Sequence, residues 1–302
     1  MGHQHQHQHE IPDLKKINTA FILGISLNVL FVIIEVIAGL MNNSLALLTD
    51  AGHNVSDIGS LLLSLMAIRL ATRKASERFT YGYKKSTILA SLLNAVILLA
   101  VVLVIIIEAV KRFNRPAEVP GLNIAIVALA GIVINALTAF LFFRDKDKDL
   151  NIKGAYLHLF ADALVSAAVV VGGLLIHFTG FYVIDPLLSL LVAAVILYST
   201  FGLLRESIKL ALDGVPENVD AEGIRKAILN TEGVRSLHHL HIWGLSTTQN
   251  AMTVHVVVAD GMKPAESAGL KKRIREMAAG LNIGHLTMEI EQESHACEEP
   301  GC

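Results

Sequence analysis

The sequence predicts an α-helical membrane protein with six transmembrane helices, followed by a C-terminal α+β domain. Of the 302 residues, 53% are hydrophobic and only 17% are charged, whereas soluble domains average about 25% charged residues. The charge is also uneven, with four charged residues from position 19 to 71 and twenty-one after position 210. Several uncharged runs reach the ~20 residues that a helix needs to cross a membrane. These features exclude a single soluble domain, a disordered chain and a nucleic-acid-binding protein that relies on positive charge.

Six helices account for the apolar part of the chain. We expect them at about 18–41, 44–71, 85–112, 119–143, 154–178 and 182–210. A short Asn-rich turn makes the first two a hairpin, and Asn-Arg-Pro and Thr-Gly segments provide later breaks. Lys and Arg cluster at one set of helix ends, fourteen against three at the other. This asymmetry predicts that both termini are cytoplasmic.

The remaining 90 or so residues predict a small domain with the order α-β-β-α-β. Asp220 is the expected N-cap of its first helix, and Val254, Val256 and Val258 give the middle strand one apolar face. We expect helices over 219–231 and 265–281, and strands over 237–245, 251–259 and 285–292. The predicted organisation is a His-rich N-terminus (1–17), a membrane domain (18–210), an α+β domain (211–292) and a His/Cys tail (293–302).

The two ends of the chain carry few structural signals. Both cysteines, Cys297 and Cys302, lie in the last six residues, so they do not form a disulfide framework. The alternating His and Gln at the start are either an affinity tag or a native metal-capturing segment, and we exclude them from the fold. No cleavable signal peptide is expected, because the start is polar and the first apolar stretch is too long.

Two His–Asp pairs in the membrane helices are the most informative feature. An ionised Asp in mid-membrane costs about 2.5–3.5 kcal/mol even on insertion scales, so its presence requires a reason. His53 precedes Asp57 by four residues in the second helix, and His158 precedes Asp162 by four in the fifth. Side chains at i and i+4 share one helix face. Two such helices offer two imidazoles and two carboxylates, which suit Zn²⁺ and balance its charge.

Other interpretations of these residues stay open at this point. Each His–Asp pair can instead be an ion pair that holds two helices together, although the repeated spacing favours a metal site. Asp50, one turn before His53, belongs either to an access path or to the end of its helix. Because four protein ligands leave no position for a reactive water, the pattern argues against a metalloenzyme.

These motifs resemble the cation diffusion facilitator family of metal/proton antiporters. The similar segments are 44–57 with His53 and Asp57, 158–162 with His158 and Asp162, and 81–94 at the start of the third helix. The resemblance covers about residues 15–292 and includes the metallochaperone-like α+β domain. It implies a homodimer in a bacterial cytoplasmic membrane that exports Zn²⁺, or Cd²⁺ or Co²⁺, against protons by alternating access. Zn²⁺ is then both the substrate and a regulatory ligand of the cytoplasmic domain.

The resemblance also implies sites outside the membrane. Lys85 and Asp213 match a charge pair that links the membrane and cytoplasmic parts of some members. Phe79 and Tyr83 stand in a loop where some members carry His ligands, so we expect no metal there. Candidate ligands in the cytoplasmic domain are His238, His239, His241, His255, His285, Glu289 and Glu291, followed by His295, Cys297 and Cys302 in the tail. Of these, His238 and His255 match family metal positions.

Strand geometry adds one expectation about these histidines. Neighbouring residues on a strand point to opposite faces, so His238 and His239 should face apart, and His239 and His241 should share a face.

The main rival to a transporter is a membrane-anchored zinc sensor or binding protein without net transport. It predicts zinc binding without accumulation of zinc in vesicles.

Overall fold

The structure is a computed structural model that describes residues 14–143, 150–295 and 297. Side chains are outside this description at 14–25, 57, 60, 61, 64, 65, 141–143 and 150–159. The His-rich start, the charged run 144–149 and Cys302 lie outside the described residues.

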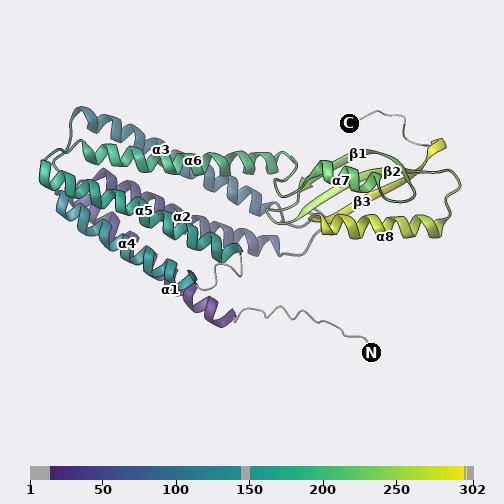
Figure 1. Ribbon diagram of the computed structural model, residues 1–302, viewed down its shortest axis with the longest axis horizontal. Coiled ribbons are helices and arrows are strands. Elements are labelled where there is room, and N and C mark those ends of the chain that lie inside the picture. Colours follow the sequence, from purple (N-terminus) through teal and green to yellow (C-terminus); the bar gives the residue numbers. More distant parts are fainter. Residues whose placement is uncertain (1–13, 144–149, 296, 298–302) are drawn as a thin grey trace. The chain divides into compact units, whose positions relative to one another are not determined.

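Within the described residues the chain begins with six long helices (Figure 1). They are α1 (Leu14–Met41), α2 (Leu45–Ala71), α3 (Ser86–Asn114), α4 (Gly121–Phe143), α5 (Leu150–Thr179) and α6 (Ile184–Ala211). Four contain described stretches long and apolar enough to cross a membrane, namely Ser86–Asn114, Gly121–Phe140, Phe160–Thr179 and Ile184–Ala211, and α1 adds the shorter Ser26–Met41. Large apolar side chains such as Leu40, Phe140 and Phe201 are about two-thirds exposed, at 66%, 67% and 66%. The predicted helical membrane fold is therefore confirmed.

The chain forms two compact units, residues 1–59 with 98–198 and residues 60–97 with 199–302. In the first unit, α4 and α5 pack closely at a pair of glycines. A Cβ atom added to Gly173 would lie 2.8 Å from the carbonyl oxygen of Gly121 and 2.8 Å from the amide nitrogen of Ala125. Small residues allow this close approach of two helix backbones in a membrane. The contact fixes the position of α5, which carries Asp162.

The C-terminal part of the second unit contains a three-stranded sheet. Its elements are α7 (Ala221–Leu229), β1 (Val234–Gly244), β2 (Asn250–Val258), α8 (Pro264–Gly280), β3 (Ile283–Gln292) and the 3₁₀ helix η1 (Glu293–His295). The sheet order is β1-β2-β3, with β2 antiparallel to β1 and parallel to β3. The N–H of Gly223 donates to Asp220 Oδ1 at 2.9 Å, which confirms the predicted N-cap. The α-β-β-α-β order is also confirmed.

This sheet has one apolar face and one polar face. The apolar core contains Met252, Val254, Val256 and Val258 of β2, packed with side chains of α7 and α8 such as Ile228 and Ile274. Alternate residues of a strand point to opposite faces. His255, which lies between two of these valines, and the matching residues Glu289 and Glu291 of β3 therefore lie on the face opposite to α7 and α8.

The backbone of β1 breaks this alternation at His239. His239 has a positive φ of 48°, and the β1–β2 register shifts between His238 and His241. An extra residue in one strand is a β-bulge, which can redirect a side chain. The rings of His238 and His239 lie only 5.0 Å apart between centroids. The expectation that these two histidines face apart was wrong, because it assumed a regular strand.

Candidate metal centres

The first candidate centre lies between α2 and α5 in the first unit. His53 Nε2 is 3.5 Å from Asp162 Oδ1, and the two side chains are 17% and 9% exposed. The side chains of Asp57 and His158 are outside the described part of the chain. Of the four residues that sequence analysis proposed for this site, the described structure thus brings together one from each helix.

A second polar contact joins α2 and α5 about one turn away. Ser166 Oγ donates to Asp50 Oδ2 at 3.4 Å, and Asp50 is only 2% exposed. Asp50 lies about one turn before His53 on α2, while Ser166 lies about one turn after Asp162 on α5. The two helices therefore run antiparallel here, with position 50 opposite 166 and position 53 opposite 162. One turn further along α2, position 57 lies level with position 158 of α5.

A third helix, α1, contributes the carboxylate of Glu35 beside α2. Asn54 Nδ2 of α2 donates to Glu35 Oε2 of α1 at 3.1 Å. Glu35 is 0% exposed and Asn54 is 9% exposed. Polar contacts of this kind hold helices together within a membrane. They position α2, which carries His53, against α1.

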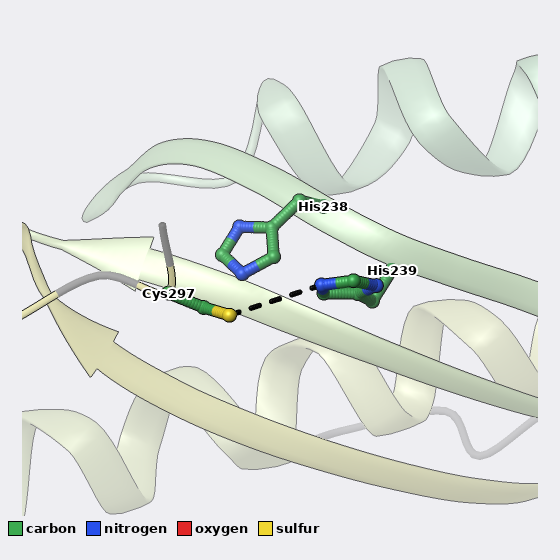
Figure 2. A group of neighbouring side chains, drawn as sticks. All are labelled: His238, His239 and Cys297. Carbon is green, nitrogen blue, oxygen red and sulfur yellow. Dashed lines mark hydrogen bonds between the residues drawn. The ribbon is translucent and has the colours of Figure 1, made fainter. Parts of the chain in front are cut away.

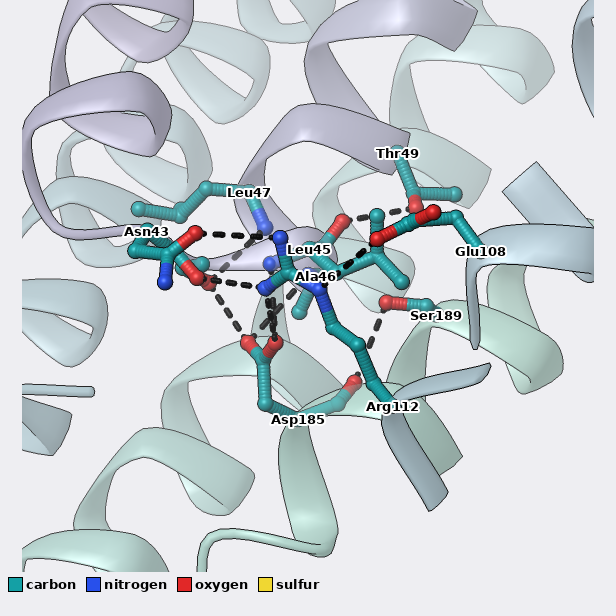
Figure 3. A network of polar contacts seen from close by, with 10 residues as sticks. Asn43, Leu45, Ala46, Leu47, Thr49, Glu108, Arg112, Asp185 and Ser189 are labelled. Carbon is teal, nitrogen blue, oxygen red and sulfur yellow. Dashed lines mark hydrogen bonds and ion pairs between the residues drawn. The ribbon is translucent and has the colours of Figure 1, made fainter. Parts of the chain in front are cut away.

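Asp185 at the start of α6 caps the start of α2 (Figure 3). Its carboxylate accepts from Ser44 Oγ at 2.6 Å, from the N–H of Leu45 at 2.8 Å and from the N–H of Ala46 at 3.2 Å. The first amides of a helix have no partner within the helix itself, and here a side chain from another helix supplies one. Asp185 is 2% exposed, so these bonds are shielded from water.

Arg112 of α3 completes the same network (Figure 3). Its Nη1 donates to the carbonyl oxygen of Asn43 at 2.6 Å, and its Nη2 donates to Asn43 Oδ1 at 3.0 Å. Nη1 also lies 4.0 Å from Asp185 Oδ2, and Nε lies 3.5 Å from Glu108 Oε1. The network joins three separate segments, residues 43–46, 108–112 and 185, so no single local sequence pattern marks all of it.

Lys85 and Asp213 meet within the second unit. Lys85 Nζ donates to Asp213 Oδ1 at 2.7 Å, and the side chains are 46% and 57% exposed. Asp213 follows α6 with a positive φ of 60°, a left-handed conformation that Asp tolerates better than most residues. The 2.7 Å distance between Lys85 Nζ and Asp213 Oδ1 is that of an ion pair. The role of this pair in linking the membrane and cytoplasmic parts stays a prediction.

We expect loss of this ion pair to change stability little. Exposed pairs contribute ~0.2–1 kcal/mol, so Lys85→Gln and Asp213→Asn should each lower the free energy of unfolding by less than about 1 kcal/mol. Both variants retain backbone geometry, and Asn also tolerates positive φ. Thermal unfolding in detergent measures these changes, and the double variant should lose no more stability than either single variant. Additive losses of stability would show that the two residues act separately.

The second candidate centre lies on the polar face of the sheet. His238 of β1 pairs with His255 of β2 in the register, and their rings lie 5.1 Å apart. Glu291 of β3 reaches both, with Oε1 at 2.6 Å from His255 Nδ1 and Oε2 at 3.3 Å from His238 Nε2. One ligand atom from each of these three residues lies within 4.8 Å of the others. This set of two imidazoles and a carboxylate suits Zn²⁺ and its neighbours.

Glu291 is held as a carboxylate by its neighbours. Burial raises the pKa of Glu291, but the hydrogen bond from the Cys297 N–H and the contacts with His255 and His238 lower it by more. The net pKa is therefore below the ordinary value for Glu. Deprotonated oxygen is the form that binds a metal.

Cys297 lies beside His238 and His239 at the same face of the sheet (Figure 2). Cys297 Sγ lies 4.0 Å from His239 Nε2, and its N–H donates to Glu291 Oε2 at 2.8 Å. One ligand atom each of His238, His239 and Cys297 lies within 4.8 Å of the others. The sequence predicts these three residues as separate candidate ligands, and the structure brings them together.

The other proposed ligands lie at the edges of the cluster or away from it. Glu289 Oε2 is 3.6 Å from His255 Nε2, and its side chain is 65% exposed. His241 and His285 are exposed, and the His285 ring stands edge-on to Tyr81 at 5.4 Å. His295 is exposed in η1. Among the described residues, none of these four belongs to either group of converging ligands.

Both the membrane part and the C-terminal domain of the chain are similar to known proteins. The family model described as the cation efflux transmembrane domain matches residues 21–210, and that of the cation efflux protein, cytoplasmic domain, matches residues 216–293. The "Cadmium, cobalt and zinc/H(+)-K(+) antiporter" of Bacillus subtilis is 38% identical over 98% of this chain and 93% of its own length. The "Zinc transporter ZitB" of Pectobacterium atrosepticum is 35% identical over 100% of this chain and 92% of its own length.

One solved structure also matches the C-terminal part. It is the "Metal-bound C-terminal domain of the CzcD transporter from Cuprividus metallidurans", with 38% identity, 24% of this chain and 99% of that chain covered, and a TM-score of 0.22. The family models match more than half of the chain, and the relatives span nearly all of it. The protein therefore belongs to the cation efflux family, the cation diffusion facilitators.

Proposed function

We propose that the protein is a divalent-metal/proton antiporter that exports Zn²⁺ from the cytoplasm by alternating access, with Cd²⁺ and Co²⁺ as further substrates. The observation that carries the proposal is the 3.5 Å separation of His53 Nε2 and Asp162 Oδ1, which belong to different membrane helices. In a tetrahedral zinc site with bonds of about 2.0–2.2 Å, such ligand atoms lie about 3.3 Å apart. The relatives named as a cadmium, cobalt and zinc antiporter and as a zinc transporter support the choice of cation.

The proposed transport site consists of His53, Asp57, His158 and Asp162. Two carboxylates and two neutral imidazoles balance a divalent cation, so the filled site has no net charge. This matters because an unbalanced charge is expensive in a low-dielectric environment. The antiparallel register of α2 and α5 supports the set, since it brings positions 57 and 158 to the same level.

Protons then compete with the metal for the same ligands. Zn²⁺ binds from the cytoplasm when both imidazoles are neutral and both carboxylates are ionised, because a metal requires deprotonated ligands. The ligands belong to two helices, so movement of α2 relative to α5 changes access to the site and the match of its ligands to the metal. Protonation on the outer side lowers the metal affinity and releases Zn²⁺. The unperturbed pKa of His, about 6.5, suits this exchange near neutral pH.

We further propose a homodimer in a bacterial cytoplasmic membrane, with both termini in the cytoplasm and the exposed apolar helix faces against lipid. Zn²⁺ bound by His238, His255 and Glu291 would regulate transport from the cytoplasmic domain. Metal at this site would join β1, β2 and β3 on the polar face of the sheet. It would thereby stabilise one conformation of the domain.

Transport by the purified protein in lipid vesicles tests the proposal. With the cytoplasmic face outward and the lumen acidic, protons leaving the vesicle should drive Zn²⁺ into it. We expect zinc to accumulate only when the pH gradient is present. Cd²⁺ and Co²⁺ should also enter the vesicles, no faster than zinc. Mg²⁺ should not enter, because it prefers oxygen ligands. Zinc binding with no accumulation would instead support the membrane-anchored sensor.

A further inference from the structure

We propose that the C-terminal tail supplies Cys297 as a thiolate ligand to a metal held by His238 and His239, so that the cytoplasmic domain carries a mixed imidazole–thiolate site. This inference rests on the proposed function only for the type of metal, and it deepens the proposed regulation. It does not depend on the transport site in the membrane.

The distances between the three side chains carry the proposal (Figure 2). One ligand atom from each of His238, His239 and Cys297 lies within 4.8 Å of the others, and Cys297 Sγ is 4.0 Å from His239 Nε2. Nitrogen and sulfur bound to one tetrahedral zinc lie ~3.5 Å apart, given bonds of ~2.0 Å and ~2.3 Å. Small side-chain rotations are therefore enough to close a metal site.

The bulge in β1 is what brings His239 to this position. In a regular strand His239 would point to the face that α7 and α8 cover, opposite to His238. The left-handed backbone at His239, with φ of 48°, is strained for a residue other than glycine. Backbone strain of this kind is concentrated at functional sites. Here it places a second imidazole beside His238 and opposite the thiol.

Two hydrogen-bonded anchors fix this part of the chain to the domain, one within η1 and one just after it. Ser294 donates to Asp260 Oδ1 from its N–H at 3.0 Å and from its Oγ at 2.9 Å. These bonds hold the pKa of Asp260 below its ordinary value. Three residues later, the N–H of Cys297 donates to Glu291 Oε2. The thiol is thus held near the histidines by two anchors that do not involve a metal.

Charge and ligand type distinguish this site from the neighbouring group. His238, His255 and Glu291 offer only nitrogen and oxygen, whereas Cys297 adds sulfur. Thiolate ligands favour softer cations such as Cd²⁺ and Zn²⁺. Two neutral imidazoles, the Cys297 thiolate and the nearby Glu291 carboxylate balance a divalent ion. Because His238 belongs to both groups, the tail would compete with His255 for the metal.

The two cysteines of the chain make a direct test possible. In the full-length Cys302→Ser protein, Cys297 is the sole thiol. We expect Cd²⁺ to produce a thiolate-to-cadmium charge-transfer absorption equivalent to one sulfur per chain. Alkylation of Cys297 by N-ethylmaleimide should become at least tenfold slower when Cd²⁺ is present. The Cys297→Ser protein, which retains Cys302, should show no such absorption.

Histidine variants in the Cys302→Ser background separate the two groups of ligands. His239→Ala should weaken cadmium protection of the thiol by at least about tenfold, since even outer partners of a metal site contribute 10–100-fold in affinity. His255→Ala should retain the absorption, and so should His285→Ala, whose residue lies outside both groups. Cadmium bound without the absorption, or protection unchanged by His239→Ala, would overturn the proposal. Zinc transport measured on the same preparations reports independently on the proposed function, so failure of one leaves the other standing.

Discussion

Asp162→Asn is expected to reduce proton-driven zinc transport by roughly 100-fold or more while the protein stays folded. Even groups that only orient metal ligands contribute 10–100-fold, and Asp162 is proposed as a ligand itself. Asparagine keeps the shape of the side chain and its capacity to hydrogen-bond with His53, 3.5 Å away. It removes the negative charge that balances the cation. The initial rate of zinc uptake into vesicles under an imposed pH gradient measures the effect.

Ser166→Ala provides the matched control on the same helix. It removes the 3.4 Å hydrogen bond to Asp50 but none of the four proposed ligands. We expect it to slow transport by less than about tenfold, below the loss for a metal ligand. Cooperative thermal unfolding of both variants shows that they are folded. Full transport by Asp162→Asn would mean that His53 and Asp162 form only a structural pair.

The second large effect is expected on stability. Asp185→Ala should lower the free energy of unfolding by at least about 3 kcal/mol, because hydrogen bonds to a charged group contribute about 1.5–3 kcal/mol each and their buried partners would be left unsatisfied. The partners are the hydroxyl of Ser44 and the first two amides of α2, within 3.2 Å of the carboxylate. Thermal unfolding in detergent, followed by circular dichroism, measures the change.

Two comparisons make this prediction specific. Asp185→Asn keeps one oxygen acceptor and should cost about half as much as Asp185→Ala. Glu108→Gln alters the same network at its surface, where Glu108 is 43% exposed and lies 3.5 Å from Arg112 Nε. We expect that change to cost less than ~1 kcal/mol. If all three variants melted at the temperature of the unchanged protein, the cap would not stabilise α2.

Local sequence signals predicted most of the fold. Long apolar runs predicted the six helices, and the alternating Val254, Val256 and Val258 predicted the apolar face of β2. Asp220 is predictable as an N-cap from its place before the helix, and the amide that it caps lies only three residues away. These features depend on neighbours in the chain. A single sequence is therefore enough to find them.

Features built from distant residues were not predictable in the same way. Asp185 caps a helix whose first amide lies 140 residues earlier in the chain, and no local pattern links the two. The bulge at His239 arises from the pairing of β1 with β2, so strand alternation alone gave the wrong face. The approach of Cys297 to His239 then depends both on this bulge and on the hydrogen bond of the tail to Glu291.

Simultaneous measurement of zinc and proton movement in the same vesicles tests the central claim most directly. A zinc indicator and a pH indicator enclosed in the lumen would record both fluxes after zinc is added outside. Antiport predicts that zinc entry is accompanied by proton exit, and that both stop in Asp162→Asn. Zinc entry with no proton exit, or unchanged exchange in Asp162→Asn, would contradict a proton-coupled transport site between α2 and α5.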